Sequence, residues 1–299
     1  MNSPRILIAG ITGFLGSRLA HEFLMKRNAA VSGIHRQASN FVRIERICSP
    51  INLYNIESQD LRAIFKYGRF DVVVNCLADY GISSTQQELI EANLHLPTQL
   101  IELASAHGAT VFLNAGTSLP ADVNDYAYAK NQFSRHMMNF CADVVAIDAR
   151  LEHFYGAGES AGRFITFLIQ RFLEPAAELD VTAGEQQRDF IYIDDVASAI
   201  GLLAQKGTNW RPGYYPISVG TGRANRLRDV VELVRGLTGN TQTHVNYGAV
   251  PHRAHEIMFS KADIGQLTNL GWRPQYSLNA GLERTVEAYR RQDRKRRAA

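Results

Sequence analysis

The chain has 299 residues, of which 45% are hydrophobic and 20% are charged, a composition typical of a globular protein with a sizeable core. This composition excludes a chain that is disordered throughout and a fibrous one. The three cysteines have no CxxC spacing, so they predict neither a disulfide framework nor a zinc site, and we expect no metal.

The net charge is +3, and segment 290–297 alone holds six arginine or lysine residues and one aspartate. The excess positive charge therefore belongs to the end of the chain, which we interpret as a frayed, solvated terminus. Nucleic-acid binding needs basic residues on a folded face with interleaved aromatics, so we expect no nucleic-acid partner. No apolar run approaches the ~20 residues that span a bilayer, and the N-terminal run is too short for a signal peptide. We expect a cytoplasmic protein without a membrane partner.

The first half of the chain alternates short apolar runs with longer helix-like segments. Nearly continuous apolar runs rich in β-branched residues are typical of strands buried on both faces. Five such runs lie at 6–10, 30–34, 72–78, 110–116 and 144–151. Segments 16–28 and 88–108 have helical spacing, and Gly108 is an expected helix stop. Repeated strand–helix units predict an α/β fold with a doubly wound parallel sheet, the Rossmann arrangement.

In the second half the regular alternation of apolar runs and helical segments ends, which predicts a smaller C-terminal substrate-binding lobe. Segments 155–164 and 207–216 are loop-like, whereas 228–240 and 277–295 have helical spacing. We expect these domain boundaries: a dinucleotide-binding domain at 1–154, to which 186–215 returns, and a lobe formed by 155–185 and 216–299.

A glycine-rich turn follows the first predicted strand. Glycines at such a turn allow a tight bend, close approach of backbone N–H groups to a pyrophosphate, and close packing of the next helix on the strand. The spacing here is GxxGxxG rather than the dinucleotide fingerprint GxGxxG, and glycines alone could mark only a turn. Between a strand and an amphipathic helix, the pattern predicts a cofactor loop. Its residues are Gly10, Thr12, Gly13, Phe14, Leu15 and Gly16.

The end of the second predicted strand indicates which dinucleotide binds. An acidic residue there would accept a hydrogen bond from the ribose 2′-OH of NAD. The sequence instead reads His35-Arg36-Gln37. An arginine can pair with a 2′-phosphate, which favours NADP(H) over NAD(H), although Arg36 could also be an exposed arginine without a ligand.

Tyr126 and Lys130 form a Tyr-x-x-x-Lys motif after the fifth predicted strand. Residues four apart share one helix face, so the ammonium can lie near the phenol. Tyrosine with an ordinary pKa near ~10 is a poor acid or base at neutral pH, and a nearby cation favours the phenolate. At the end of that strand, the hydroxyl of Thr117 can hydrogen-bond a substrate carbonyl. Ser118 is the alternative, and either hydroxyl could instead be a simple cap.

Together these residues resemble the extended short-chain dehydrogenases/reductases, which modify nucleotide-sugars. The resemblance runs from residue 5 to about 290. Beyond GITGFLG and YAYAK it includes NCLA at 75–78, RLEHFYGAG at 150–158, RDFIYIDDV at 188–196, and RAHE followed by LGWRP near the end. RDFIYIDDV is the most specific of these segments.

The resemblance implies roles for individual residues. Tyr126 is the expected acid/base, Lys130 holds the nicotinamide ribose and lowers the tyrosine pKa, and Thr117 polarises the sugar carbonyl. The implied substrate-binding residues are His153, Arg188 and Arg253, with the arginines on a diphosphate. Arg188 could instead form a structural ion pair with Asp189 or Asp195. The complete expected cofactor set is Gly10, Thr12, Gly13, Phe14, Leu15, Gly16, His35, Arg36, Asn52, Leu53, Leu77, Ala78, Asn93 and Lys130.

Departures from the family pattern narrow the expected reaction. The family's sugar 4,6-dehydratases carry Asp-Glu after the catalytic threonine, whereas Ser118-Leu119 follow here. Asn52-Leu53 stands where an aspartate commonly touches adenine, and the segment from Thr117 to Tyr126 is short. The chain looks most like the CDP-sugar 4-ketoreductases.

We therefore expect NADPH-dependent reduction of the C4 ketone of a nucleotide-linked 4-keto-6-deoxyhexose, in deoxysugar biosynthesis. The alternatives are a 4-epimerase with bound NAD and a non-catalytic NADP(H) sensor on the same fold. Family likeness also implies a homodimer through helices such as 88–108 and 126–141.

Overall fold

The computed structural model describes residues 3–174 and 177–298, and it divides into two compact units. Unit 1 is Met1–Leu151 with Ala197–Val219, and unit 2 is Glu152–Val196 with Gly220–Ala299. Unit 1 contains one large sheet, and unit 2 contains two small ones.

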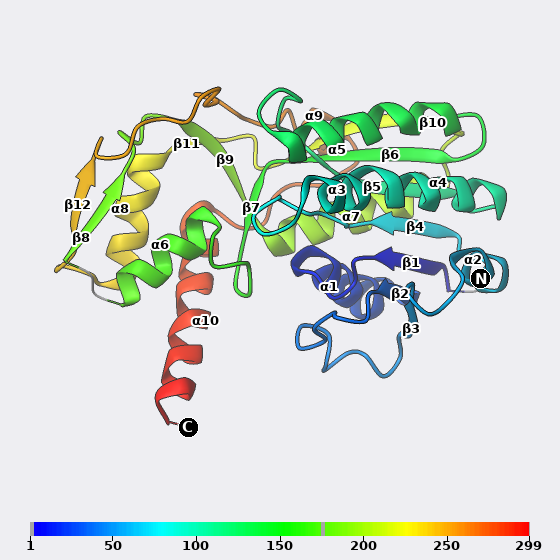
Figure 1. Ribbon diagram of the computed structural model, residues 1–299, viewed down its shortest axis with the longest axis horizontal. Helices are drawn as coiled ribbons and strands as arrows, with labels where there is room; N and C mark the ends of the chain where they lie inside the picture. The colour runs from blue at the N-terminus through cyan, green and yellow to red at the C-terminus, as the bar shows by residue number, and fades with distance from the viewer. Residues whose placement is uncertain (1–2, 175–176, 299) are drawn as a thin grey trace. The chain divides into compact units, whose positions relative to one another are not determined.

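Unit 1 contains one seven-stranded sheet with the order β10-β6-β5-β4-β1-β2-β3, in which all neighbouring strands are parallel (Figure 1). Its strands are β1 (Arg5–Ala9), β2 (Ala30–His35), β3 (Asn52–Asn55), β4 (Val72–Asn75), β5 (Val111–Thr117), β6 (Val145–Leu151) and β10 (Gly213–Val219). This sheet confirms the doubly wound, Rossmann-like fold expected from the sequence.

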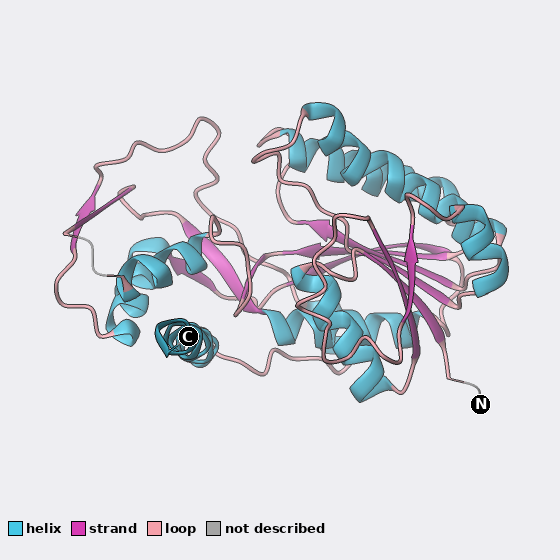
Figure 2. Cartoon of the chain, turned by 60° about the horizontal axis from the view of Figure 1, so that its bottom comes forward, coloured by secondary structure: helices cyan, strands magenta, loops and turns pink. Residues whose placement is uncertain are grey.

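Helices cover both faces of this sheet (Figure 2). They are α1 (Phe14–His21), η1 (Glu22–Lys26), α2 (Leu61–Gly68), α3 (Gln86–Ile90), η2 (Glu91–His95), α4 (Leu96–Ala106), α5 (Asp125–His136), η3 (Met137–Phe140) and α7 (Ile193–Gly207). On one face, Val73, Phe112 and Ala146 belong to a buried cluster with residues of α2, α4 and α5. On the other face, Gly207 of α7 packs against Ile147 and Val111.

Two strands of unit 1 were missed in the sequence, and both are edge strands. β3 has no fully buried residue, and β10 is mostly half-buried and contains Pro216. An edge strand is not buried on both sides, so it lacks the continuous apolar run that marks the inner strands. The expectation that 207–216 forms only a connection was therefore wrong.

Unit 2 contains two small sheets, with strand orders β11-β9-β7 and β12-β8. Its strands are β7 (His153–Tyr155), β8 (Glu178–Val181), β9 (Gln187–Tyr192), β11 (Ala224–Arg226) and β12 (His244–Tyr247). Its helices are α6 (Phe164–Leu173), α8 (Leu227–Thr238), α9 (Gly265–Asn269) and α10 (Leu278–Ala298).

The chain crosses between the units three times, after Leu151, Val196 and Val219, and all three crossings differ from the expected boundaries after 154, 185 and 215. Residues 187–192 lie in unit 2 because β9 pairs with β7 and β11 of that unit. Residues 216–219 lie in unit 1 because they continue β10 beside β6. The second crossing falls inside α7, after Val196.

The basic C-terminal segment is helical rather than frayed. α10 runs on to Ala298, so the backbone of this segment continues a helix that packs on α6 and α8. The side chains beyond Arg294 lie outside the described residues. Among the described residues, no helix is both long enough and apolar enough to cross a membrane.

Candidate active site

The glycine loop connects β1 to α1 and has the backbone that a phosphate site requires. Gly10 has φ +78°, a conformation that side chains rarely adopt, and the N–H of Gly13 donates to its carbonyl at 2.9 Å. A Cβ on Gly16 would collide with the Gly10 carbonyl, so the helix packs directly on the turn. α1 begins at Phe14, with Gly13 as its N-cap. The first N–H groups of a helix lack intrahelical partners and attract an anion, so the loop fits a dinucleotide pyrophosphate.

The end of β2 carries His35 and, just beyond it, the exposed Arg36. The Arg36 backbone N–H donates to Ser39 Oγ at 3.0 Å, which closes a short turn. Hydrogen bonds from Thr85, and also the charge of Arg36, lower the pKa of Glu88. The positive charge of Arg36 therefore acts on Glu88, and no acidic residue occupies the strand end itself.

A carboxylate that the sequence analysis missed lies close to this turn. The backbone N–H of Gln37 donates to Glu57 Oε2 at 2.7 Å, although Glu57 comes 20 residues later. It reaches the turn because β3, which ends at Asn55, pairs with β2. Asn52 and Leu53, which stand where the family has an adenine contact, lie on β3. Asn52 is exposed and Leu53 is half-buried.

Tyr126 and Lys130 lie one turn apart on α5. Asn124 caps this helix by accepting a hydrogen bond from the Ala127 N–H at 2.8 Å. The Tyr126 ring is half-buried and packs against Tyr80, with 4.7 Å between ring centroids.

Lys130 is only 1% exposed, and its Nζ donates to the Leu77 carbonyl at 3.1 Å. Burial lowers the pKa of Lys130 to about 8, while the Asp148 carboxylate and, to a smaller extent, Cys76 oppose that shift. Burial raises the pKa of the Cys76 thiol to about 12, so the thiol remains neutral. Lys130 is therefore a buried amine whose charge can change within a few pH units of neutrality.

Thr117 is the last residue of β5, and its hydroxyl is half-buried. Its Oγ1 accepts a hydrogen bond from the Leu119 N–H at 3.2 Å. The hydroxyl therefore caps the backbone N–H of Leu119, which was the alternative interpretation of Thr117. In this hydrogen bond the hydroxyl oxygen is the acceptor. Its own proton stays available for a carbonyl oxygen.

Asn93 lies in η2, a π-helical turn, and is fully buried. Its Nδ2 donates to the carbonyls of Asp79 and Leu89, at 2.7 and 2.9 Å, and its Oδ1 accepts from the Asp79 N–H at 3.2 Å. Its amide therefore orients the segment that follows β4, where Leu77 is half-buried and Ala78 exposed.

In unit 2, Arg188 lies on β9 with its guanidinium buried. Its NH2 donates to Glu256 Oε1 at 2.6 Å, and its NH1 donates to the Gln187 carbonyl at 2.9 Å. Burial lowers the pKa of Arg188, whereas the carboxylates of Glu256 and Glu152 raise it. The exposed Arg253 lies in the turn that carries Glu256, because the Glu256 N–H donates to the Arg253 carbonyl at 3.2 Å.

The sequence suggested Asp189 or Asp195 as a partner for a structural ion pair with Arg188, and both suggestions were wrong. Asp189 is fully buried and accepts hydrogen bonds from the N–H groups of Thr221 and Gly222 and from the Thr221 hydroxyl. Asp195 accepts from the N–H groups at 275 and 276. Both carboxylates hold loops of unit 2, and Glu256 is the partner of Arg188.

His153 begins β7 and is half-buried beside Phe190. Its Nδ1 lies 3.5 Å from Glu152 Oε2, without the geometry of a hydrogen bond. Glu152 is 6% exposed, and both of its oxygens lie 2.8 Å from the Ser260 hydroxyl. The sequence analysis missed Glu152, although a carboxylate between Leu151 and His153 was a visible signal.

Three further polar residues were missed: Asn75, Asn114 and Asp148, which lie in β4, β5 and β6 and are each no more than 1% exposed. They interrupt apolar strands, and Asn75 also begins the NCLA segment at 75–78 that carries part of the resemblance. No group of three His, Cys, Asp or Glu residues in the described part of the chain could hold a metal ion.

Comparison with known proteins identifies the family. The model of the NAD dependent epimerase/dehydratase family matches residues 6–218. CDP-abequose synthase from Salmonella muenchen is 31% identical over 294 residues, which cover 95% of this chain and 97% of that protein. CDP-abequose synthase from Salmonella typhimurium is 29% identical, covering 94% and 97%.

Among solved structures, UDP-glucose 4-epimerase from Thermotoga maritima has a TM-score of 0.82 at 22% identity, covering 96% of this chain and 99% of that one. The likeness in structure shows the fold, and the family match confirms the resemblance seen in the motifs. The chain belongs to the NAD dependent epimerase/dehydratase family and is an NAD(P)-dependent enzyme of the short-chain dehydrogenase/reductase type.

Proposed function

We propose that this enzyme reduces the C4 ketone of a nucleotide-linked 4-keto-6-deoxyhexose with NADPH, in deoxysugar biosynthesis. The observation that carries the proposal is the pairing of Tyr126 with the buried cation Lys130 on α5, in the same unit as the hydroxyl that ends β5. The two CDP-abequose synthases, similar over nearly their whole length, support a deoxysugar nucleotide as substrate.

The backbone of the glycine loop fits the cofactor, because Gly10 has a positive φ and Gly16 packs against the Gly10 carbonyl, so that α1 begins directly at the turn. Gly13 and the first turn of α1 bind the pyrophosphate, and Lys130 holds the nicotinamide ribose. When bound, the reduced nicotinamide supplies a hydride to the ketone carbon.

The residues of the chain handle the oxygen of that ketone. Thr117 donates a hydrogen bond to it and shares its developing charge. Tyr126 donates the proton, and the ammonium of Lys130 stabilises the phenolate that remains. In this scheme the Tyr126 phenol transfers one proton, and it transfers it to the ketone oxygen.

The proposed preference for NADPH rests on Arg36 and on the absence of a carboxylate from the end of β2. Ser39, which closes the Arg36 turn, adds a hydroxyl that can donate to a 2′-phosphate. Glu57 opposes this preference, because its carboxylate holds the N–H of Gln37. Arg36 is therefore the residue on which the preference depends.

Water elimination is not part of the proposed reaction. The two residues after Thr117 are Ser118 and Leu119, so neither is a carboxylate that could act as an acid or base for elimination.

For the substrate, we propose that Arg188 and Arg253 bind the diphosphate, as planar guanidinium groups suit phosphate oxygens. His153 is proposed to contact the nucleotide-sugar beside them.

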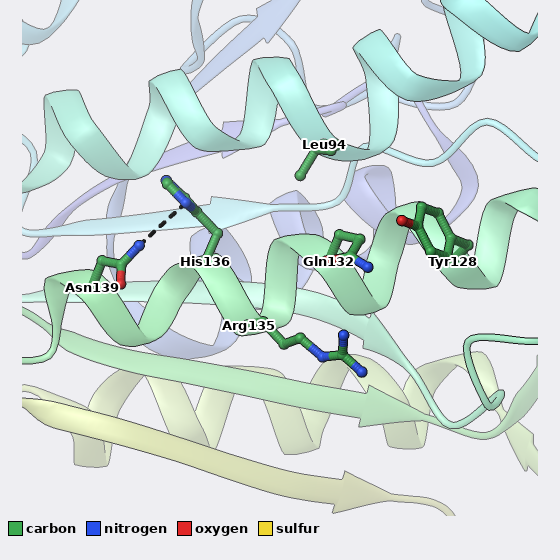
Figure 3. A pocket seen from close by; sticks show the side chains of 6 residues that line it. All are labelled: Leu94, Tyr128, Gln132, Arg135, His136 and Asn139. Atoms are coloured by element: carbon green, nitrogen blue, oxygen red, sulfur yellow. Dashed lines mark hydrogen bonds between the residues drawn. The ribbon is translucent and has the colours of Figure 1, made fainter.

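We also propose a homodimer formed through the outer face of α5. Tyr128, Gln132, Arg135 and His136 of α5, together with Asn139 of η3 and Leu94 of η2, line a cavity of about 480 Å³ (Figure 3). Tyr128 is 55% exposed, and His136 Nε2 is buried without a hydrogen-bond partner.

Light scattering on size-exclusion fractions tests the dimer. Tyr128→Glu is expected to give the mass of a monomer, because it replaces the aromatic side chain of this face with a charged one. Tyr67→Glu, at a tyrosine that is 76% exposed on α2, is the matched control and is expected to leave the dimer intact.

The reaction is tested with a panel of CDP-, GDP-, dTDP- and UDP-linked 4-keto-6-deoxyhexoses and NADPH, followed by the loss of reduced cofactor. We expect oxidation of NADPH and a C4 alcohol with at least one member. Absence of turnover across the panel would overturn the reductase assignment, and stoichiometric NAD⁺ in the purified protein would favour the 4-epimerase.

A further inference from the structure

A row of polar side chains crosses three neighbouring strands in unit 1, at the last residue of β4 and at the middle of β5 and β6. Asn75 Nδ2 donates to Asn114 Oδ1 at 2.9 Å, and Asn114 Nδ2 donates to Asp148 Oδ1 at 2.9 Å. These residues are directly opposite one another in the parallel registers of β4, β5 and β6. We call this row the amide ladder.

The ladder lies where apolar side chains would ordinarily pack. Two residues earlier on the same strands are Val73, Phe112 and Ala146, which belong to the core shared with α4 and α5. Side chains two apart on a strand point to the same face, so the ladder extends this row toward the strand ends on the face that α5 covers. Buried polar groups cost stability unless each is hydrogen-bonded, so a ladder here needs a reason beyond packing.

Asp148 is the charged end of the ladder. Its Oδ2 accepts from the Tyr214 hydroxyl at 3.2 Å and from Arg150 Nε at 3.4 Å. Its Oδ1 lies against Gly116, where a Cβ would collide with it. Gly116 thus leaves the room that Asp148 occupies, and it directly precedes Thr117.

The other end of the ladder reaches the segment that binds the lysine. Asn75 Oδ1 accepts from the Leu77 N–H at 3.2 Å, and the carbonyl of the same Leu77 accepts from Lys130 Nζ at 3.1 Å. Lys130 is therefore connected through Leu77, Asn75 and Asn114 to a carboxylate two strands away.

We propose that Asp148 is a positioning residue for Lys130: through the amide ladder it fixes the Leu77 segment, and it supplies the buried negative charge that keeps the lysine protonated. Its effect on turnover rests on the proposed function, whereas its effect on the charge of Lys130 does not.

The charges around Lys130 agree with this proposal. Burial favours the neutral amine, and the groups that oppose burial are Asp148 from β6 and, more weakly, Cys76 after β4. The Cys76 thiol has a pKa of about 12 and carries no charge near neutrality. Asp148 is itself faced by Arg150 and Tyr214, and Arg150 is about half exposed, so solvent reduces its influence. Tyr126 lies one turn before Lys130 on the same helix.

The test is the titration of Lys130, followed by NMR of the lysine ε-carbons in selectively labelled, ligand-free protein. The chain has few lysines, and the signal lost in Lys130→Met assigns the resonance. Asp148→Asn keeps the shape of the side chain and removes its charge. We expect the pKa of Lys130 to fall by about one unit in this variant.

A charge-swap variant keeps the test decisive if the single substitution folds poorly. Asp148→Asn combined with Asn114→Asp retains an amide–carboxylate pair and moves the charge one strand, about 4.8 Å, toward Asn75. We expect it to restore the Lys130 pKa at least to its original value. Tyr214→Phe removes a hydrogen bond to Asp148 but no charge, and we expect the titration to stay unchanged.

Two results would overturn the proposal: a Lys130 pKa that is the same in Asp148→Asn as in the original chain, or a swap variant that titrates like Asp148→Asn. If the reductase is confirmed, Asp148→Asn should also lower kcat, by about twofold at pH 7 and by close to tenfold above about pH 9, because a fall of the Lys130 pKa from about 8 by one unit changes the protonated fraction by these factors. An inert panel of ketosugars alongside the expected lysine shift would refute the proposed reaction and leave this inference standing.

Discussion

The two units each bury a cation, and they treat it differently. In unit 1, Lys130 donates to the neutral carbonyl of Leu77, and the Asp148 carboxylate acts through a ladder of amides. In unit 2, Arg188 is ion-paired directly with Glu256 at 2.6 Å. The lysine can therefore gain or lose a proton near neutral pH, whereas the arginine stays charged and is held in place by Glu256.

This difference suits different tasks. A titratable ammonium beside a phenol can assist proton transfer, and a fixed guanidinium can bind phosphate without changing state. We expect substitutions of Lys130 and its neighbour Tyr126 to change kcat, and substitutions of Arg188 to change KM.

The largest effect is expected for Tyr126→Phe. Removing the phenol removes the proton donor, and kcat should fall by about a thousandfold or more. Cofactor affinity, measured by quenching of protein fluorescence, should stay within about twofold. A variant that keeps its turnover would contradict the role of Tyr126 and favour the NADP(H) sensor.

Lys130→Met tests whether burial lowers the pKa of Lys130, through the pH dependence of the free energy of unfolding. The folded-state pKa of about 8 lies below the ordinary value of 10.5, so the unfolded chain binds the extra proton between these two values. Because the unfolded state binds more protons there, the free energy of unfolding of the original chain should rise with pH from about 8 to 10.5, relative to Lys130→Met.

Below pH 8 the lysine is charged in both states, and its burial penalty is fully present. Lys130→Met should then be more stable than the original chain, by up to about 3 kcal/mol for a shift of this size. Urea unfolding of both proteins at pH 7 and pH 10 measures the difference. A constant difference across this range would show that the folded-state pKa of Lys130 is not lowered.

Arg188→Gln tests the other side of the comparison. Loss of one charge-assisted contact to a diphosphate should raise the KM for the nucleotide-sugar by about 30-fold, with kcat nearly unchanged. Glu256→Gln is the matched variant, because it loosens the ion pair and keeps the arginine. Its KM should be close to or below that of the original enzyme, since its side chain no longer competes with phosphate. An equal rise in KM for both variants would make the ion pair a structural one.

The smallest effect is expected for Arg36→Ala. This cation is exposed, so its contribution to binding a 2′-phosphate is screened by solvent. The ratio of kcat/KM for NADPH over NADH should fall by about tenfold. Arg43→Ala, on the following segment, is a nearby comparison that should change the ratio less. An unchanged ratio in Arg36→Ala would remove the basis for the NADPH preference.

Much of unit 1 could be predicted from the sequence, because its inner strands are buried on both faces and are apolar along most of their length. The glycine loop was visible for a similar reason: the positive φ of Gly10 and the contact between Gly16 and Gly10 admit no side chain. Tyr126 and Lys130 could be paired because helix geometry places residues four apart on one face.

Other features depend on contacts between residues far apart in the chain. β3 and β10 carry no continuous apolar run, since sheet position rather than composition decides that they are edge strands. Glu57 reaches the Arg36 turn only through the pairing of β3 with β2, and Glu256 reaches Arg188 across 68 residues.

The local pattern of residues determined the Rossmann fold, the glycine loop and the Tyr–Lys pair, because each follows from backbone geometry within a few residues. Only the tertiary structure decided which carboxylate meets which cation, and how deeply Lys130 is buried. Electrostatic free energies depend on distance and on exclusion of water, and both are settled when strands and helices from distant parts of the chain pack together.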